Sequence, residues 1–406
     1  MNKLVKIHPI KVIFVLTYLL PVNGQQVLNE TYLHAKADMI REEFSQAGEK
    51  ILSIPEGERT ADMYLTLGKS FYYSGNFEEA ANYFEFSEKI RSNPETQLYA
   101  ARTHAMIQQS GNAVEWLLKY LSQRDKLSES ELTLDPAFSK IERSREWRNM
   151  WESREWYTVA DRREAEATIL LRRNRHIDAL TVIDAEIARG ASARFHALRA
   201  KAYEAMGEYQ PAHESAQNAI RMRNNSVEYL AHAAKMAANV DRFDVALENI
   251  NRAIRIEPYM LDLYLQRAYI FRKNQKFDDA RNDINFYFKY LPHEPRAMFQ
   301  MGLTETDAGN HWEGIEYFTV LIDNDQTSPE YFIARARALI NVNDFADAGF
   351  DLSQALDLNP ELPEAWHNQG IVLHRELQLE DACHYWRRAL QMGHRESAEY
   401  IYRFCL

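Results

Sequence analysis

Four histidines and one cysteine near the C-terminal end are of residue types that could hold a metal ion. They are His367, His374, His384 and His394, with Cys383 between them. A metal site needs three or four such side chains to converge at roughly 2.0–2.3 Å from one ion. The spacing divides these residues between two helices that face different ways, so we expect no metal site and no cofactor. His367 and His374 share a helix face, so we expect this pair to lie on a surface or in a groove.

Known catalytic motifs are absent from the sequence. It contains no His-Glu-x-x-His, Cys-x-x-Cys, Gly-x-Ser-x-Gly or Gly-x-Gly-x-x-Gly. Gly309 and Gly314 have the glycine separation of a phosphate-binding loop, but Ile315 and Glu316 stand where such a loop requires Lys followed by Ser or Thr. We therefore predict a non-enzymatic protein with no catalytic residues. An enzyme that uses the His-rich C-terminal segment is the alternative.

A cluster of arginines alternates with acidic residues between positions 161 and 175. Its members are Arg162, Arg163, Arg172, Arg173 and Arg175, interleaved with Asp161, Glu164 and Glu166. We interpret the cluster as a solvated helix face, and contact with an anion or an acidic partner is the alternative. The formal net charge of the chain is -11. This charge argues against nucleic acid as the main ligand, because a duplex binder needs a basic face.

The first residues have the order of a secretory signal peptide. Three lysines, the last of them Lys11, precede the apolar run 12–20 (VIFVLTYLL), and residues 21–24 (PVNG) then supply a helix breaker and small residues. The apolar run is much shorter than the roughly 20 residues of an ordinary membrane-spanning helix. We predict that 1–24 is a signal peptide and that the chain is exported, periplasmic or secreted, with no membrane span after cleavage. An uncleaved anchor or a frayed cytosolic N-terminus is the alternative.

Cys383 and Cys405 are the two cysteines of the chain. Two cysteines cannot form a disulfide framework, so packing must hold the fold together even in an oxidising compartment. A bridge between the two is conceivable, but we expect two separate buried thiols.

Small residues recur every 34 residues through the C-terminal part of the chain. They stand at Ala212, Ala246, Ala280, Gly314, Ala348 and Ala382. Three residues before each stand Tyr209, Phe243, Phe277, His311, Phe345 and Leu379. Twelve residues before each stand Ala200, Ala234, Ala268, Gly302, Ala336 and Gly370.

This spacing predicts stacked pairs of antiparallel helices. Two small residues that lie mid-helix on facing helices let the axes approach to about 8–10 Å. The larger residue at the start of the second helix fills the gap at the turn, and Pro258, Pro292 and Pro360 end three of the units. One hairpin cannot bury its own apolar faces, so neighbouring hairpins must stack into one continuous core.

The period and these positions resemble the tetratricopeptide repeat. The aromatic residue near the start of its first helix is matched by Tyr64, Tyr264, Phe332 and Trp366, and the small residue four positions later by Gly68, Ala268, Ala336 and Gly370. Six consecutive units span about 193–396, an out-of-phase unit lies at 160–192, and further copies lie at 61–93 and, with a shorter turn, at 95–122. The resemblance implies an all-α fold, a right-handed α-solenoid of stacked antiparallel hairpins with about nine units in two groups.

Residues 123–158 break the period. They resemble a closing segment that follows repeat groups in many bacterial proteins, in which Asp135-Pro136 starts a turn or helix. We expect Phe138, Ile141 and Trp147 to cover the apolar flank of the preceding hairpin, and a long functional insertion is the alternative.

These patterns divide the chain into four parts. After the signal peptide we predict an N-terminal repeat group with its closing segment at 25–158, which begins with an amphipathic helix or helical pair at 29–54. A C-terminal solenoid at 159–396 follows. The last residues, 397–406, are predicted to form a capping helix that packs Tyr400, Phe404 and Leu406 on the final hairpin.

The resemblance implies that a partner binds along the concave face, which the first helix of each unit lines. The candidate binding residues, carried over by position, are Lys201, Lys235, Leu265, Tyr269, Arg272, Phe299, Arg337, His367 and His374. Aromatic rings beside cations suit an extended segment with apolar and acidic side chains. That Tyr269 and Phe299 belong partly to the core is the alternative. The carboxylate clamp of the chaperone-binding members does not match, since Ala197, His232 and Asp262 occupy three of its positions.

We therefore predict a protein–protein interaction scaffold in the cell envelope that binds an extended peptide or a partner helix in its groove. The alternative is an accessory or regulatory subunit of an envelope secretion or assembly machine, which docks through its convex face.

Overall fold

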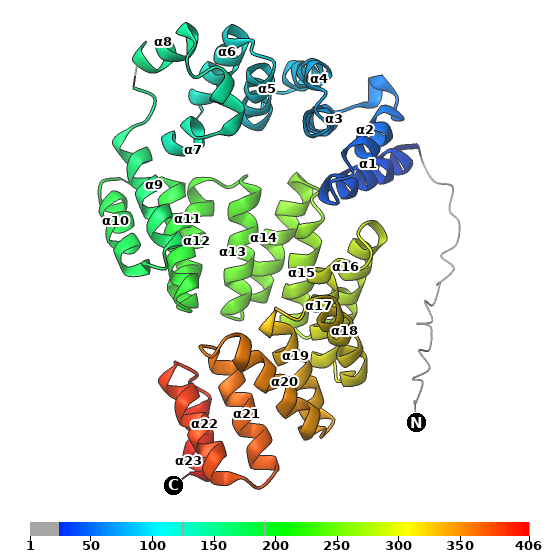
Figure 1. Cartoon of the computed structure of the whole chain (residues 1–406), viewed down its shortest axis with the longest axis vertical. Coiled ribbons are helices and arrows are strands. Elements are labelled where there is room, and N and C mark those ends of the chain that lie inside the picture. The colour runs from blue at the N-terminus through cyan, green and yellow to red at the C-terminus, as the bar shows by residue number, and fades with distance from the viewer. Residues whose placement is uncertain (1–23, 124–125, 154, 191, 406) are drawn as a thin grey trace. The chain divides into compact units, whose positions relative to one another are not determined.

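The computed structural model describes residues 24–123, 126–153, 155–190 and 192–405. The predicted signal peptide lies outside these residues apart from Gly24, so it stays a prediction. The described part folds into 23 α-helices and two 3-10 helices without a strand, which confirms the all-α prediction (Figure 1). The chain divides into two compact units, Met1–Thr96 and Gln97–Leu406.

The first unit consists of two helix pairs. They are α1 (Gly24–Ile40) with α2 (Phe44–Leu52) and α3 (Ala61–Tyr73) with α4 (Phe77–Ile90), connected through the 3-10 helix η1 (Glu56–Glu58). α3 and α4 are the predicted repeat copy, and α1 and α2 are the predicted helical pair. The buried Tyr32 hydroxyl donates to the Asp62 carbonyl at 3.0 Å and lies 2.9 Å from the Thr66 hydroxyl, which attaches α1 to α3.

The second unit begins within α5 and continues as a stack of helix hairpins. Its helices are α5 (Pro94–Met106), α6 (Ser110–Leu121), α7 (Glu129–Thr133), η2 (Pro136–Lys140), α8 (Arg145–Ser153), α9 (Val159–Arg172), α10 (His176–Ala188), α11 (Ala193–Ala205), α12 (Tyr209–Met222), α13 (Val227–Asn239), α14 (Phe243–Ile256), α15 (Asp262–Lys273), α16 (Phe277–Tyr290), α17 (Pro295–Asp307), α18 (His311–Asn324), α19 (Pro329–Asn341), α20 (Phe345–Leu358), α21 (Pro363–Arg375), α22 (Leu379–Gln391) and α23 (Ser397–Phe404). Each hairpin from α9 with α10 to α21 with α22 packs on the next one, as a solenoid requires.

The 34-residue register lies where the two helices of a hairpin meet. The small residues that open the register, such as Ala212 and Ala348, are 0% exposed. The turn between the helices needs a left-handed residue, which Gly207, Asp241 and Asn343 supply with φ of 73°, 57° and 62°. The predicted helix contacts and turns of the repeat are therefore confirmed.

The three register glycines of the first helices face large aromatic rings. A Cβ added at Gly302 would lie 2.6 Å from Phe318, which stands 16 residues later on the second helix. The register alanines face smaller side chains instead, so the volume of each pair is matched. The glycine pairs are Gly68 with Phe84, Gly302 with Phe318 and Gly370 with Trp386, and alanine pairs are Ala234 with Ile250, Ala268 with Ile284 and Ala336 with Leu352.

Two hairpins are joined internally by buried arginine–aspartate pairs at the same register positions. Arg267 donates from Nε and Nη2 to both carboxylate oxygens of Asp283, at 2.8 and 2.7 Å. Arg335 makes the same two bonds to Asp351 at 2.8 and 2.7 Å. Such paired bonds fix two helices in one orientation.

The segment that breaks the period is ordered by capping and apolar packing. The Asp135 side chain accepts from the Ala137 N–H at 3.0 Å, so η2 begins where the sequence predicts a turn or helix. Phe138, Ile141 and Trp147 are 1%, 2% and 7% exposed, and α8 packs on α6. The predicted coverage of the preceding hairpin is therefore confirmed. The predicted domain boundary at 158/159 describes repeat groups rather than compact units, and it stays a prediction.

The last helix folds back on the final hairpin, as the sequence predicts for residues 397–404. The Tyr400 ring lies 5.0 Å and the Phe404 ring 5.9 Å from the Trp386 ring, between ring centroids. Leu406 lies outside the described residues. The expectation of two separate thiols is wrong, because Cys383 of α22 and Cys405 form a disulfide. The return of α23 onto α22 brings these residues together although they are 22 positions apart.

Candidate functional site

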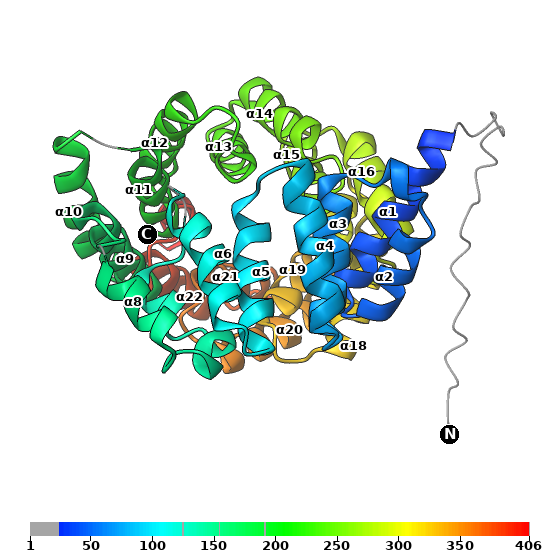
Figure 2. The ribbon, with the colours of Figure 1, turned by 90° about the horizontal axis from the view of Figure 1, so that it is seen from above.

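The first helices of successive hairpins lie on the inner side of the curve in the second unit. α13 packs on α15, α15 on α17, α17 on α19 and α19 on α21, in addition to the contacts within hairpins. Helices of a curved stack approach one another most closely on its inside. Figure 2 shows α13 inside the arc and α14 outside it. We call the solvent-facing side of α11, α13, α15, α17, α19 and α21 the first-helix surface.

Charged side chains pair across neighbouring units at the start of this surface. Lys201 lies 2.8 Å from Glu228, and Lys235 lies 2.7 Å from Glu204, between nitrogen and oxygen atoms. His232 Nε2 lies 2.8 Å from the other Glu204 oxygen. Burial alone would raise the pKa of Glu204, but hydrogen bonds from His232 and Lys235 outweigh it and lower this pKa to about 2. The predicted groove residues Lys201 and Lys235 are therefore on the surface, each beside a carboxylate.

The low pKa of Glu204 predicts an acid-sensitive link between α11 and α13. A carboxyl group whose pKa falls from 4.5 in the unfolded chain to about 2 in the fold stabilises the fold above pH 4.5, and this stabilisation is lost as the pH falls towards 2. We expect Glu204→Gln to lower the free energy of unfolding by about 2 kcal/mol at about pH 6 and by much less at about pH 3. Urea unfolding at both pH values measures the difference. Glu228→Gln, at the more exposed pair, is the control, and an equal loss at both pH values would contradict the link.

Two arginines and one aspartate connect three first helices farther along the surface. Arg272 of α15 donates to Asp307 of α17 at 2.5 Å, and Arg337 of α19 donates to the other oxygen at 3.1 Å. The Arg272 guanidinium also lies 5.5 Å from the centre of the Tyr269 ring, whose hydroxyl donates to Asn239. Two guanidinium groups thus share one carboxylate, which leaves this group of three side chains with a net positive charge. This charge favours an acidic ligand side chain.

Phe299 and Leu265 lie deeper than the rest of the predicted groove. Phe299 is half-buried, with ring centroids 5.8 Å from Phe318 and 5.4 Å from Tyr331. The alternative that it belongs partly to the core therefore fits the structure. Leu265 is 8% exposed. Its position along the helix matches a groove position of the family, but neighbouring helices cover it, so it cannot face a ligand here.

The C-terminal histidines are covered by the capping helix. His367 is 5% exposed and stacks on His394 with 4.2 Å between ring centroids, while the His374 ring packs 4.3 Å from Phe404. The expectation that His367 and His374 share an open surface is therefore wrong, because α23 covers this end of the stack. Burial, together with the neighbouring His394, lowers the pKa of His367 to about 4.

A cation-rich pocket continues the first-helix surface towards α9, and the sequence analysis missed most of it. Its volume is about 260 Å³, and its charged lining residues are Lys126, Arg194, Lys201 and Arg223 against Glu164 and Glu228. Lys126 and Arg223 lie in connections between helices, outside the 34-residue register. Arg194 stands 34 residues before Glu228, so a search for alternating charge at the repeat period could have found it.

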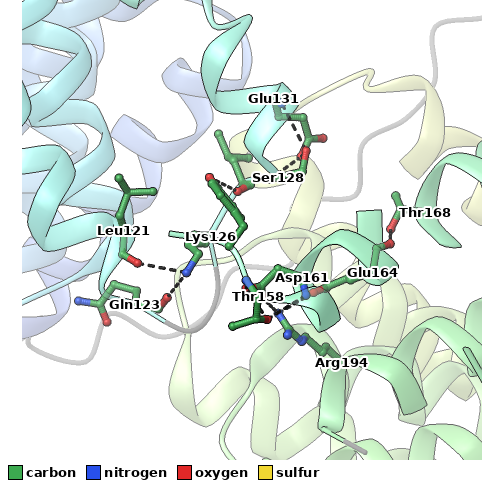
Figure 3. Close-up of polar contacts among 12 residues, drawn as sticks. Leu121, Gln123, Lys126, Ser128, Glu131, Thr158, Asp161, Glu164, Thr168 and Arg194 are labelled. Atoms are coloured by element: carbon green, nitrogen blue, oxygen red, sulfur yellow. Dashed lines mark hydrogen bonds and ion pairs between the residues drawn. The ribbon is translucent and has the colours of Figure 1, made fainter. Parts of the chain in front are cut away.

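Polar contacts fix the wall of this pocket, as Figure 3 shows. Thr158 and Asp161 form a capping box at the start of α9, with Asp161 accepting from the Thr158 N–H at 2.7 Å. The Arg194 guanidinium lies 2.6 Å from Asp161 and 2.7 Å from Glu164, which attaches α11 to α9. The Lys126 ammonium donates to the Leu121 carbonyl at 3.1 Å and keeps its charge beside the pocket.

The arginines of 162–175 have exposed side chains paired with nearby acids. Arg162 lies 2.6 Å from Glu155, and Arg172 lies 3.2 Å from Glu131. This agrees with the interpretation as a solvated helix face. Nothing in the described part of the chain has the length and apolarity of a membrane-crossing helix.

Comparisons with known proteins agree with the hairpin geometry. Residues 65–128 and 265–329 match the family model of the tetratricopeptide repeat. Tetratricopeptide repeat protein 16 of Homo sapiens is 24% identical over 212 residues, which cover 48% of this chain and 24% of that protein. The protein of the same name from Macaca fascicularis is 23% identical, with the same coverage. The chain therefore spans about a quarter of the length of these relatives.

Two solved structures are also similar to the chain. A tetratricopeptide repeat protein from Parabacteroides merdae has 17% identity and a TM-score of 0.48, over 57% of this chain and 93% of that one. Yeast Tom70 has 12% identity and a TM-score of 0.42, over 93% and 95% of the two chains. With its 34-residue register, its buried small residues and these sequence matches, the chain is a tetratricopeptide repeat protein with an all-α solenoid fold.

Proposed function

We propose that this chain is a non-enzymatic, exported scaffold that binds an extended protein segment or a partner helix along the first-helix surface. Its repeats support a role in protein–protein interaction. The observation that carries the proposal is the charge arrangement of this surface. Two arginines share Asp307, and four cations face two carboxylates in the adjoining pocket.

This arrangement favours a partner segment with acidic side chains. Arg337 and Lys235 are 38% and 47% exposed in their side chains, so both can reach a ligand without a change of fold. Tyr269 and Phe299, which are half-buried between them along the stack, can offer ring edges to apolar side chains. The proposed ligand is therefore a mixed acidic and apolar protein segment, and nucleic acid is not proposed as a ligand.

Export is supported by two separate features. The order of lysines, apolar run and small residues at the N-terminus is that of a signal peptide. The Cys383–Cys405 disulfide belongs to an oxidising compartment, since such bonds are rare where thiols are kept reduced. We therefore propose the cell envelope or its exterior as the site of action.

The test is a pull-down of residues 25–406 from the envelope fraction of the host, followed by mass spectrometry. We expect Lys235→Ala/Arg337→Ala to lower the affinity for the captured protein at least about tenfold, because each lost charge-assisted bond contributes about 1.5–3 kcal/mol. Unchanged far-UV circular dichroism shows that the variant stays folded. Capture of cytosolic proteins alone would contradict export.

The second candidate is docking through the second helices, as a subunit of an envelope machine. Trp312 of α18 and Phe350 of α20 are each 61% exposed, an unusual exposure for two large aromatic residues. Trp312→Ala/Phe350→Ala is therefore the matched control for the pull-down. Loss of the captured protein in this variant, with binding retained by Lys235→Ala/Arg337→Ala, would contradict the first-helix site and favour the second candidate.

A further inference from the structure

The end of the solenoid brings together three side chains that the sequence separates. His367 lies on α21, while His394 and Glu396 lie in the connection between α22 and α23. One ring nitrogen of each histidine and one carboxylate oxygen of Glu396 all lie within 4.8 Å of one another. We propose that these three residues bind a zinc ion, at a site that is separate from the first-helix surface.

A buried hydroxyl group orients both imidazole rings. Ser397 is 0% exposed, and its Oγ lies 2.9 Å from His367 Nδ1 and 3.2 Å from His394 Nδ1. A serine oxygen can accept two hydrogen bonds, so it can take the Nδ1–H of both rings and leave both Nε2 lone pairs for an ion. Zinc-binding histidines in proteins are held in this way by a hydrogen bond to the other ring nitrogen.

The surrounding fold fixes the connection that carries His394 and Glu396. The Tyr400 ring meets the His367 ring edge to face, with 4.9 Å between centroids, and Trp386 Nε1 donates to the His367 carbonyl at 3.1 Å. The disulfide attaches the far end of α23 to α22. A preformed cluster on fixed elements loses little entropy when an ion binds.

Two imidazoles and one carboxylate form a donor set that zinc prefers. Zinc–ligand bonds are about 2.0–2.2 Å long for these donors, so the ligand atoms must approach to somewhat over about 3 Å from one another. Glu396 is exposed, and rotation of its side chain can supply this closure. Three protein ligands leave a fourth tetrahedral position open, which water or a side chain of a partner can fill.

The experiment uses the full oxidised chain, without an affinity tag and without thiol reagents, because both bind zinc. Isothermal titration with ZnCl₂ should show one site, and the melting temperature should rise with zinc because the ion binds the folded state. Cobalt titration should give the visible absorption of a tetrahedral complex. We expect His394→Ala and Glu396→Gln each to lower zinc affinity at least about tenfold.

His384→Ala is the matched control, since His384 is an exposed histidine of the neighbouring α22. It should bind zinc as the unchanged protein does. Absence of zinc binding by the unchanged protein would overturn the proposal. So would zinc binding of equal affinity in His394→Ala and Glu396→Gln, because the ion would then sit elsewhere. His367 is left in place because its burial would make a loss of folding indistinguishable from a loss of binding.

Discussion

Gly302→Ala is expected to lower the free energy of unfolding by about 3 kcal/mol, the upper part of the range for overpacked cores. The added Cβ would lie 2.6, 2.9 and 3.1 Å from three atoms of the Phe318 ring. That ring is 0% exposed, so it has no free space to move into. Urea unfolding of the variant measures the loss.

A second substitution tests whether the ring is the cause. Gly302→Ala/Phe318→Leu copies the natural pair Ala336 and Leu352 of the next hairpin. We expect the double variant to be more stable than the sum of the two single losses predicts, with a coupling of about 1 kcal/mol or more. Strict additivity would contradict this explanation.

Gly349→Ala is the control for the effect of a methyl group in a helix. Gly349 lies within α20, where an added Cβ meets Val372 at 3.4 Å, a distance that the neighbour can accommodate. Alanine favours a helix over glycine by about 1 kcal/mol, so this variant should be neutral or more stable. A loss as large as that of Gly302→Ala would mean that register position does not decide the cost.

The sequence predicts the hairpins well because their packing is local and periodic. Ala212 and Ala348 had to be small if two helices 12 residues apart in register touch, and both are fully buried. The out-of-phase unit follows the same rule, since Ala167 and Ala179 are also 0% exposed. Even the closing segment could be predicted, because Asp135-Pro136 carries its own capping signal.

The candidate sites were harder to predict because they depend on contacts outside the repeat. Nothing in the spacing of His367 and His394 shows that α23 turns back and stacks the two rings. The same return explains the disulfide. Lys126 and Arg223 line the pocket from connections, whose paths the period does not determine. Pairing also changes what a predicted residue can do, since Arg272 already holds Asp307 before any ligand arrives.

Arg335→Ala is expected to lower the free energy of unfolding by about 3–5 kcal/mol, because it leaves a buried carboxylate without its partner. Asp351 is 1% exposed in its side chain, and burial raises its pKa although Arg335 opposes this. Without the arginine the carboxyl group can escape the penalty only by taking up a proton. The loss should therefore be smaller at acidic pH, which unfolding at two pH values measures. Arg163→Ala, at an exposed pair with Glu166, should leave stability unchanged.

The chain itself suggests the variant that separates the cost of an unpaired charge from the worth of the pair. At the same two register positions, the hairpin of α17 and α18 carries Met301 and Tyr317 instead of an arginine and an aspartate. Replacing a whole buried ion pair by apolar residues is often neutral. Arg335→Met/Asp351→Tyr should therefore recover more than half of the stability that Arg335→Ala loses. A double variant as unstable as the single one would show that the two hydrogen bonds, rather than the avoided burial of a lone charge, hold α19 and α20 together.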